Sequence, residues 1–199
     1  MKYFQYSNSE AGQESFVLNM LDEKREGYYV EIGAFESRKT SNTYLLEGLY
    51  DWKGVALEIV LEHVREYNQN RSNPCILADA TEFDYLAYFI EHDFPRQIDY
   101  LQLDIEPASS TLEALKKLPL NHYRFSVITF EHDLYYGPEN KAVKEEQKEL
   151  LTSLGYELAV ENVMVDAPGW PLREFEDWWV DPKIVSKEKY KDLKLRYMD

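Results

Sequence analysis

Short apolar runs alternate along this chain with segments whose apolar residues recur at helical spacing. The run Tyr28–Ile32 is nearly continuous in apolar residues, which is typical of a strand buried on both faces of a parallel sheet. Ahead of it, residues 12–24 place Phe16, Met20 and Leu21 on one helical face. This alternation predicts a parallel sheet covered by helices.

The same alternation continues as far as residue 163. The later predicted strands are, in chain order, Gly54–Glu58, Cys75–Ala78, Ile98–Asp104, Arg124–Phe130 and Tyr156–Val163. Helices are predicted between these strands. Ser41 is a candidate N-cap for a helix that carries Leu45 and Leu46, and Ser110 with Glu113 forms a candidate capping box for a later one. Residues 62–68, Leu86–Ile90 and residues 143–154, the last followed by Gly155, indicate the other helices.

Beyond residue 163 the alternation stops. Ala167–Pro171 is a turn-rich loop, Trp178–Val180 predicts a last strand, and residues 186–197 predict a terminal helix. Two strands with no helix between them indicate an antiparallel hairpin. We therefore expect an α/β fold with a mostly parallel sheet of seven strands, a C-terminal antiparallel hairpin, and helices on both faces.

Composition fits a single globular domain over residues 1–199, with a helical segment at 1–26 and a Trp-rich closing segment at 164–199. The single cysteine, Cys75, excludes an internal disulfide and a cysteine-rich zinc site. No stretch approaches the ~20 apolar residues of a membrane span, and residues 1–5 lack the apolar core of a secretory signal. We expect a cytoplasmic protein.

The formal net charge of −15 limits the partners. Surface acids repel a phosphate backbone and an anionic membrane face, so we expect neither nucleic acid nor membrane as a partner. A small neutral or polar acceptor fits this charge better. A homo-oligomer is compatible with the sequence, which leaves the oligomeric state open.

A glycine turn and an acid stand at the ends of the first two predicted strands. Gly33 follows the first strand, where it lets the backbone turn tightly and a nucleotide approach closely. Glu58 ends the second strand, where a ribose diol needs a partner with two acceptors. The pair predicts a cofactor that contains adenosine. The G-x-G-x-x-G turn of a nicotinamide-dependent dehydrogenase is absent, since only Gly33 of that pattern is present.

A second group of polar residues ends the fourth and fifth predicted strands. Asp104 ends the fourth strand, and Glu131, His132 and Asp133 follow the fifth. Because ligands in open α/β sheets bind at the carboxyl ends of strands, we expect these side chains to face one crevice. Carboxylates there suit a hard divalent cation such as Mg²⁺, whereas imidazole is a poor Mg²⁺ ligand, so His132 leaves Mn²⁺ or another transition metal open as well. Without a metal, His132 is the candidate general base.

Several segments, in this order and spacing, resemble the FkbM-type family of class I S-adenosylmethionine-dependent methyltransferases. The matching segments are Gly12–Val17, Val30–Ala34, Ser41–Glu47, Trp52–Glu58, Leu103–Glu106 and Glu176–Trp179. The resemblance implies methyl transfer from S-adenosylmethionine to a hydroxyl of a sugar or other small molecule. It places the cofactor on Glu31, Gly33, Ala34, Ser41, Asn42, Glu58, Ile59, Asp79, Ala80 and Asp104.

A further similarity, to catechol-type O-methyltransferases, implies metal ligands after the fourth and fifth strands, here Asp104, Glu131 and His132, which are also the expected catalytic residues. The chain departs from the FkbM pattern at Phe35–Ser37, at Ile59 in place of proline, and at Pro107 in place of glycine. Two alternatives therefore stay open. One is a metal-dependent hydrolase that uses Asp133 as well, and the other is a non-catalytic module that binds the cofactor.

Overall fold

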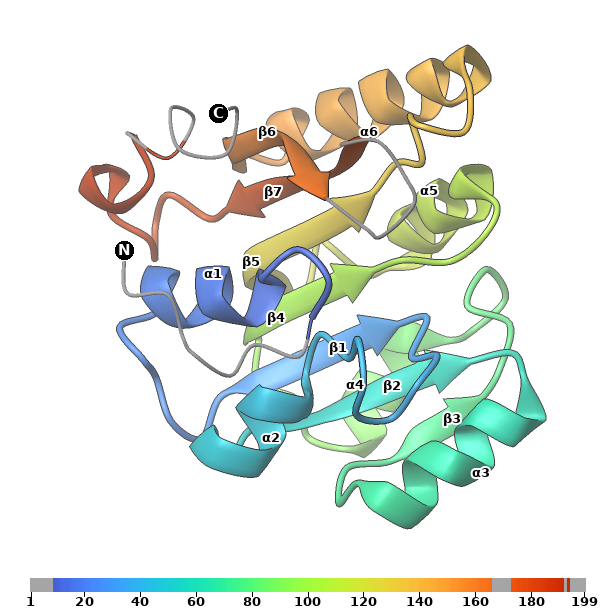
Figure 1. Ribbon diagram of the computed structural model, residues 1–199. Helices are drawn as coiled ribbons and strands as arrows, with labels where there is room; N and C mark the ends of the chain where they lie inside the picture. The colour runs from blue at the N-terminus through green and yellow to red at the C-terminus, as the bar shows by residue number, and fades with distance from the viewer. Residues whose placement is uncertain (1–8, 166–172, 192, 194–199) are drawn as a thin grey trace.

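The computed structural model describes residues 9–165, 173–191 and 193, which form one seven-stranded sheet with helices on both faces (Figure 1). The strands are β1 (Tyr28–Ile32), β2 (Lys53–Glu58), β3 (Cys75–Leu77), β4 (Gln97–Leu103), β5 (Arg124–Glu131), β6 (Glu157–Val165) and β7 (Arg173–Val180). The helices are α1 (Gln13–Met20), α2 (Tyr44–Tyr50), α3 (Leu61–Asn70), α4 (Tyr85–Glu91), α5 (Ala108–Lys117) and α6 (Lys141–Ser153), with 3₁₀ turns η1 (Pro138–Asn140) and η2 (Lys187–Lys189).

The strand order is β3-β2-β1-β4-β5-β7-β6. Strands β1 to β5 run parallel to one another, whereas β7 runs antiparallel to both β5 and β6. The predicted α/β fold with a C-terminal antiparallel hairpin is confirmed. The boundaries of the predicted strands lie within a few residues of the observed ones, except that β7 begins five residues before Trp178, at Arg173.

The strand order reverses between β1 and β4, and this position determines where a ligand can bind. From β1 the chain moves outward through β2 and β3, then returns to β4 on the other side of β1. The connecting segments leave in opposite directions and open a crevice at the carboxyl ends of these two strands. Gly33 follows β1 at this crevice, and Asp104 follows β4.

Two apolar layers hold the helices against the sheet. Phe89 of α4, Leu115 of α5 and Leu151 of α6 are buried in the layer on one face. On the other face, α1 and α2 share a layer with β7, and Phe16 stacks on Trp178 with ring centroids 4.4 Å apart. Helix α3 covers the same face over β2 and β3. Figure 1 shows α1 and α2 in front of the sheet.

Two predicted helix boundaries differ from the structure. Helix α5 begins at Ala108 after Pro107, so the predicted capping box at Ser110 and Glu113 is wrong, because Ser110 already lies in the first turn. Proline suits a helix start, where no partner for its nitrogen is needed. In the described part of the predicted terminal helix only η2 forms, and residues 192 and 194–199 lie outside the described residues, as does the turn-rich loop 167–171.

Across the described ranges, no helix combines the length and the apolar character that crossing a bilayer requires.

Candidate functional site

A cavity of about 150 Å³ opens at the crevice between the carboxyl ends of the parallel strands. Its walls come from the segments that follow β1, β2, β3 and β4, together with the first turn of α5. Half of the predicted cofactor residues line it, namely Gly33, Glu58, Ile59, Asp79 and Ala80.

Gly33 allows two strand ends to approach each other closely. Its backbone has φ +89°, in the left-handed region that favours glycine. A Cβ atom at this position would lie 1.7 Å from the backbone carbonyl oxygen of Asp104. A side chain at position 33 would therefore push the ends of β1 and β4 apart and reshape the cavity floor.

Backbone N–H groups fix the Glu58 carboxylate at the cavity wall. Its Oε2 accepts a hydrogen bond from the N–H of Phe35 at 2.9 Å, and its Oε1 accepts one from the N–H of Val60 at 2.8 Å. His63 lies close by, with its Nδ1 3.9 Å from Oε2. Each carboxylate oxygen has a second lone pair, so this fixed group offers two adjacent acceptors to a diol.

Ile59 and Asp79 form the outer part of the cavity. The Ile59 side chain lines the cavity and is 67% exposed, so its apolar surface is available to a ligand. Asp79 accepts hydrogen bonds from the hydroxyl and the backbone N–H of Thr81, and these bonds lower the pKa of its carboxyl. An apolar face beside a carboxylate suits a purine that carries an amino group.

Glu31 lies outside this cavity, in the layer beneath α2 and α3. Its side chain is 1% exposed and accepts hydrogen bonds from the Thr43 hydroxyl at 2.7 Å and the Tyr67 hydroxyl at 3.3 Å. Burial raises the pKa of Glu31 to about 7, although nearby Arg71 and these hydrogen bonds act in the opposite direction. Ala34 packs in the same layer and does not line the cavity either.

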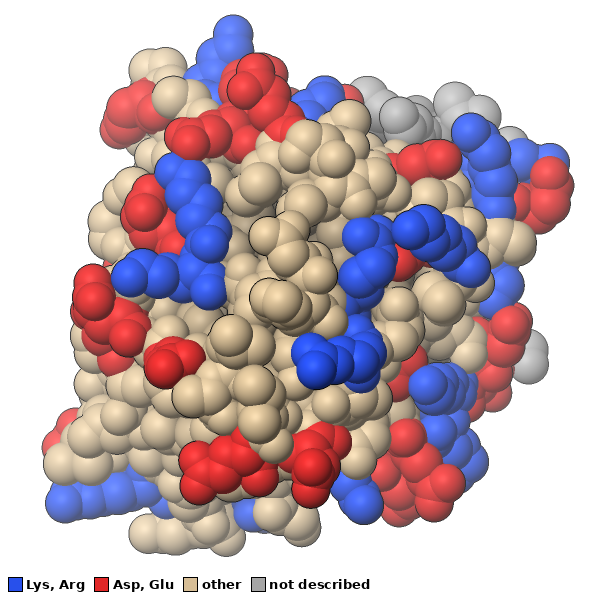
Figure 2. Space-filling view, turned by 180° about the vertical axis from the view of Figure 1, so that it is seen from behind, with Lys and Arg blue, Asp and Glu red and all other residues tan. Residues whose placement is uncertain are grey.

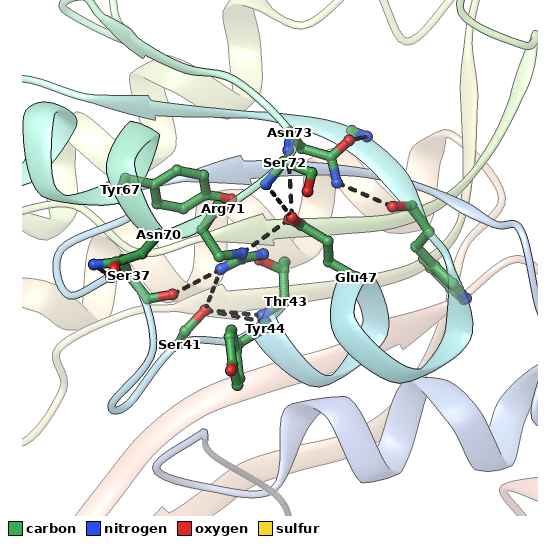
Figure 3. A network of polar contacts seen from close by, with 12 residues as sticks. Ser37, Ser41, Thr43, Tyr44, Glu47, Tyr67, Asn70, Arg71, Ser72 and Asn73 are labelled. Carbon is green, nitrogen blue, oxygen red and sulfur yellow. Dashed lines mark hydrogen bonds and ion pairs between the residues drawn. The ribbon is translucent and has the colours of Figure 1, made fainter.

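Arg71, which no sequence pattern indicated, ties the segment after Gly33 to the end of α3 (Figure 3). Its Nη1 donates to the backbone carbonyl of Ser37 at 2.9 Å and to the Ser41 hydroxyl at 3.1 Å. Its Nη2 donates to the Thr43 hydroxyl at 2.9 Å, and its Nε donates to Glu47 at 2.8 Å. A buried guanidinium with this many acceptors holds the loop between β1 and α2 in one position.

The two predicted polar residues in that loop have different surroundings. The Ser41 hydroxyl oxygen accepts hydrogen bonds from the backbone N–H groups of Thr43 and Tyr44, so it caps the start of α2 as well as contacting Arg71. Asn42 is also buried, but its Oδ1 has no hydrogen-bond partner among the described residues. Of the two, only Asn42 has a side-chain acceptor still available.

The carboxyl groups of Asp104 and Glu131 lie at the ends of β4 and β5, near enough to each other to share a proton. Burial and the charge of Asp104 raise the pKa of Glu131 well above its usual range, and burial raises that of Asp104. Glu176 of β7, which pairs with Glu131 across the strands, has its pKa raised by burial in the same way. A proton shared between Asp104 and Glu131 keeps the two side chains together.

His132 does not join this group. Successive side chains of a strand point to opposite faces, and His132 follows Glu131 directly. The imidazole is 0% exposed, its Nδ1 accepts from the N–H of Leu134 at 3.3 Å, and its Nε2 lies 3.7 Å from Asp177. The structure therefore does not bring His132 together with Asp104 and Glu131.

No cluster of three or more His, Cys, Asp or Glu side chains among the described residues is arranged to hold a metal ion. The divalent cation that the sequence led us to expect has no support in this geometry. A metal-dependent hydrolase would need the same cluster of metal ligands, so the geometry of the described residues gives that alternative no support either.

A second, larger cavity of about 640 Å³ adjoins the first, and Glu106 lines both. Asp133, Tyr136, Glu139 and Asn140 line it, on the segment between β5 and α6. Because Glu106 lines both, the two cavities lie side by side at the carboxyl edge of the sheet.

No family model matches this chain, and no curated protein matches it in sequence. Solved structures do match it in fold. A Clostridium thermocellum protein named "putative rRNA-methylase" has a TM-score of 0.58 at 11% identity, covering 89% of this chain and 97% of its own. The O-methyltransferase from Bacillus cereus, in complex with SAH, has a TM-score of 0.53 at 15% identity, covering 89% and 84%.

Fibrillarin from Aeropyrum pernix, with natively bound S-adenosyl-L-methionine, has a TM-score of 0.51 at 12% identity, covering 79% of this chain and 67% of that one. At these identities the likeness shows the fold. The chain has the Rossmann-like fold of class I methyltransferases.

Proposed function

We propose that this protein is an S-adenosylmethionine-dependent methyltransferase that acts on a hydroxyl of a small molecule. The observation that carries the proposal is the Glu58 carboxylate, which two backbone N–H groups hold in a cavity at the point where the strand order reverses. Cofactors bind at this point in open α/β sheets. The fold neighbours named with S-adenosylmethionine or SAH support this choice of cofactor.

The cavity residues fit the adenosine half of the cofactor. Glu58 would accept hydrogen bonds from the ribose diol, Ile59 would cover one face of the adenine, and Asp79 would accept from its amino group. Asn42, on the loop after Gly33, does not line the cavity, and its buried Oδ1 is assigned no contact with the cofactor. When bound, S-adenosylmethionine supplies an electrophilic methyl group on its sulfonium.

The structure turns His132 away from the acids at the ends of β4 and β5, so it is not proposed as the general base. A hydroxyl becomes a good nucleophile only as its proton leaves, and a positioned base typically accelerates such a step by ~10²–10⁴-fold. Asp133 lines the second cavity and lies near enough to Asp104 to raise the pKa of that carboxyl. The Asp104–Glu131 pair lies at the ends of β4 and β5, and the backbone carbonyl of Asp104 lies against Gly33.

The resemblance to FkbM-type enzymes supports a hydroxyl on a sugar or other small molecule as the acceptor. RNA is named for one fold neighbour, the Clostridium thermocellum protein. The net charge of −15 argues against RNA here, since phosphates would meet a surface of the same sign.

Isothermal calorimetry with S-adenosylmethionine and with SAH tests the proposal. We expect both to bind the natural chain, and Glu58→Ala to weaken binding about tenfold or more, because the diol loses a charged acceptor. The matched control is Glu62→Ala, an exposed acid in the first turn of α3, which should leave binding unchanged. No binding of either ligand to folded protein at about 1 mM, or equal binding by Glu58→Ala, would reject the proposal.

A further inference from the structure

Every charged side chain that lines the second cavity is acidic. Glu106, Asp133 and Glu139 contribute three carboxyl groups, and no Lys or Arg is among the described residues that line it. Low-dielectric walls concentrate the field of like charges, so the cavity attracts cations and repels anions. The cavity of about 640 Å³ is of the size that small organic molecules occupy.

Asp133 carries the strongest indication of a ligand. Its side chain is only 4% exposed, and its Oδ1 has no hydrogen-bond partner among the described residues. Its backbone is fixed, since its carbonyl accepts from the Asn140 side chain at 2.8 Å and from the N–H of Tyr136 at 2.9 Å. A buried carboxylate oxygen without a donor is costly, and a cationic donor in the cavity would remove that cost.

Tyr136 supplies an aromatic wall to the same cavity. It is 61% exposed and packs on Tyr135 with ring centroids 4.5 Å apart. Its hydroxyl lies 3.4 Å from a carboxylate oxygen of Glu106 and donates to it. An exposed ring in a cavity that carboxylates also line can bind an ammonium group by cation–π attraction as well as by charge.

We propose that this cavity selects a methyl acceptor that carries a positive charge, an amine-bearing small molecule whose ammonium group binds between Asp133, Glu106 and the ring of Tyr136. The inference rests on the proposed function, because the cavity adjoins the cofactor cavity through Glu106. The charged group anchors the acceptor, and a hydroxyl on the same molecule is then presented towards the cofactor. Acceptors with a phosphate or carboxylate in this position are excluded by repulsion.

Three phenols of matched size and different charge test this selection. Tyramine carries an ammonium group at neutral pH, tyrosol carries a hydroxyl there, and 4-hydroxyphenylacetate carries a carboxylate. Binding to the natural chain in the presence of saturating SAH is measured by ligand-observed NMR titration at low salt. We expect tyramine to bind about tenfold more tightly than tyrosol, and the acid to bind least.

Asp133→Asn keeps the shape and removes the charge, so it should weaken tyramine binding about tenfold and leave tyrosol binding unchanged. Glu139→Gln, at an exposed position, should weaken tyramine binding in the same direction and provides a second variant if Asp133→Asn does not fold. Glu91→Gln, an exposed acid on α4, removes the same net charge elsewhere and should change neither ligand's binding.

Equal binding of the three phenols, tighter binding of the acid, or no tyramine binding at about 10 mM overturns the inference. If SAH binds and tyramine is not preferred, this inference fails and the proposed methyltransferase stands. If SAH does not bind, the titrations are repeated without it. A preference for tyramine in those titrations means that the cation site stands and the proposed methyltransferase fails.

Discussion

Glu31 lies one residue before the end of β1 and Glu58 ends the neighbouring parallel strand β2, yet their surroundings give them different properties. Glu58 accepts two backbone N–H groups at the wall of a cavity. Glu31 is buried beneath α2 and α3 among Thr43, Tyr67 and Arg71, where its charged form lacks water. Glu58 is therefore available to a ligand in the cavity, whereas Glu31 is buried in the interior.

The raised pKa of Glu31 has a consequence for stability. Its pKa is about 7 in the folded protein against 4.5 as the ordinary value, so the folded state binds the extra proton between these limits. The cost of burying the charge is absent below pH 4.5, grows as pH rises, and is complete above pH 7. We expect Glu31→Gln to remove this contribution, which is on the order of 1–3 kcal/mol.

Urea unfolding of the natural chain and of Glu31→Gln at several pH values between 4.5 and 8 measures the effect. The difference in unfolding free energy between the two should shift in favour of the variant as pH rises. Other buried acids, such as Glu131, are present in both proteins and cancel. Parallel profiles would show that Glu31 does not titrate in this range, and exposed Glu62→Gln serves as the control.

At the scale of elements, helix α1 links distant parts of the sheet. Phe16 stacks on Trp178 of β7, and Glu14 accepts a hydrogen bond from the N–H of Leu45 at the start of α2. The helix therefore holds β7 and the end of the loop between β1 and α2 against the same apolar layer. Arg71 holds that loop from the other side.

Removing the aromatic contact tests the role of α1. Phe16→Ala leaves a cavity in a fully buried layer and should lower the unfolding free energy by about 3–5 kcal/mol. Leu49→Ala on α2 is the control, since that leucine is largely exposed and should change stability by less than about 1 kcal/mol. Urea unfolding at one pH measures both variants. If Phe16→Ala lowers the unfolding free energy no more than the control does, the contact does not stabilise the fold as proposed.

At the scale of the whole molecule, the excess of acids acts on stability as well as on partner choice. The formal net charge is −15. On the face shown in Figure 2, acidic and basic groups are interspersed around an area of uncharged residues. The acids of the second cavity, by contrast, lie together without a basic neighbour in its lining.

Repulsion among the excess acids should weaken as salt is added. Raising NaCl from about 20 mM to about 500 mM shortens the Debye length from roughly 20 Å to roughly 4 Å. We expect the thermal midpoint to rise by about 2–4 °C, the shift that ~1 kcal/mol produces in a chain of this size. Calorimetric scans in KCl should agree with those in NaCl, and a lower midpoint at high salt would show that favourable ion pairs outweigh the repulsion.

Local patterns predicted much of the architecture. Apolar runs bounded by turns predicted the central strands because β1, β2, β4 and β5 are buried on both faces over most of their length. The missing helix after Val163 indicated the antiparallel hairpin. Gly33, Glu58 and Asp79 reach one cavity because the ends of parallel strands meet at one edge. The start of α5 was misplaced because Pro107 begins a helix as readily as a capping box does.

The amino-acid sequence alone determined the sheet, the direction of each strand, and the edge of the sheet at which the polar residues after the strands gather. These properties follow from local periodicity and strand chirality. Which acids face a ligand was decided only when the chain closed. The one-residue alternation along β5 turned His132 away from Asp104, and the packing of α3 brought Arg71 to the loop. Such choices depend on contacts between residues far apart in the chain, and these contacts leave no local pattern to detect.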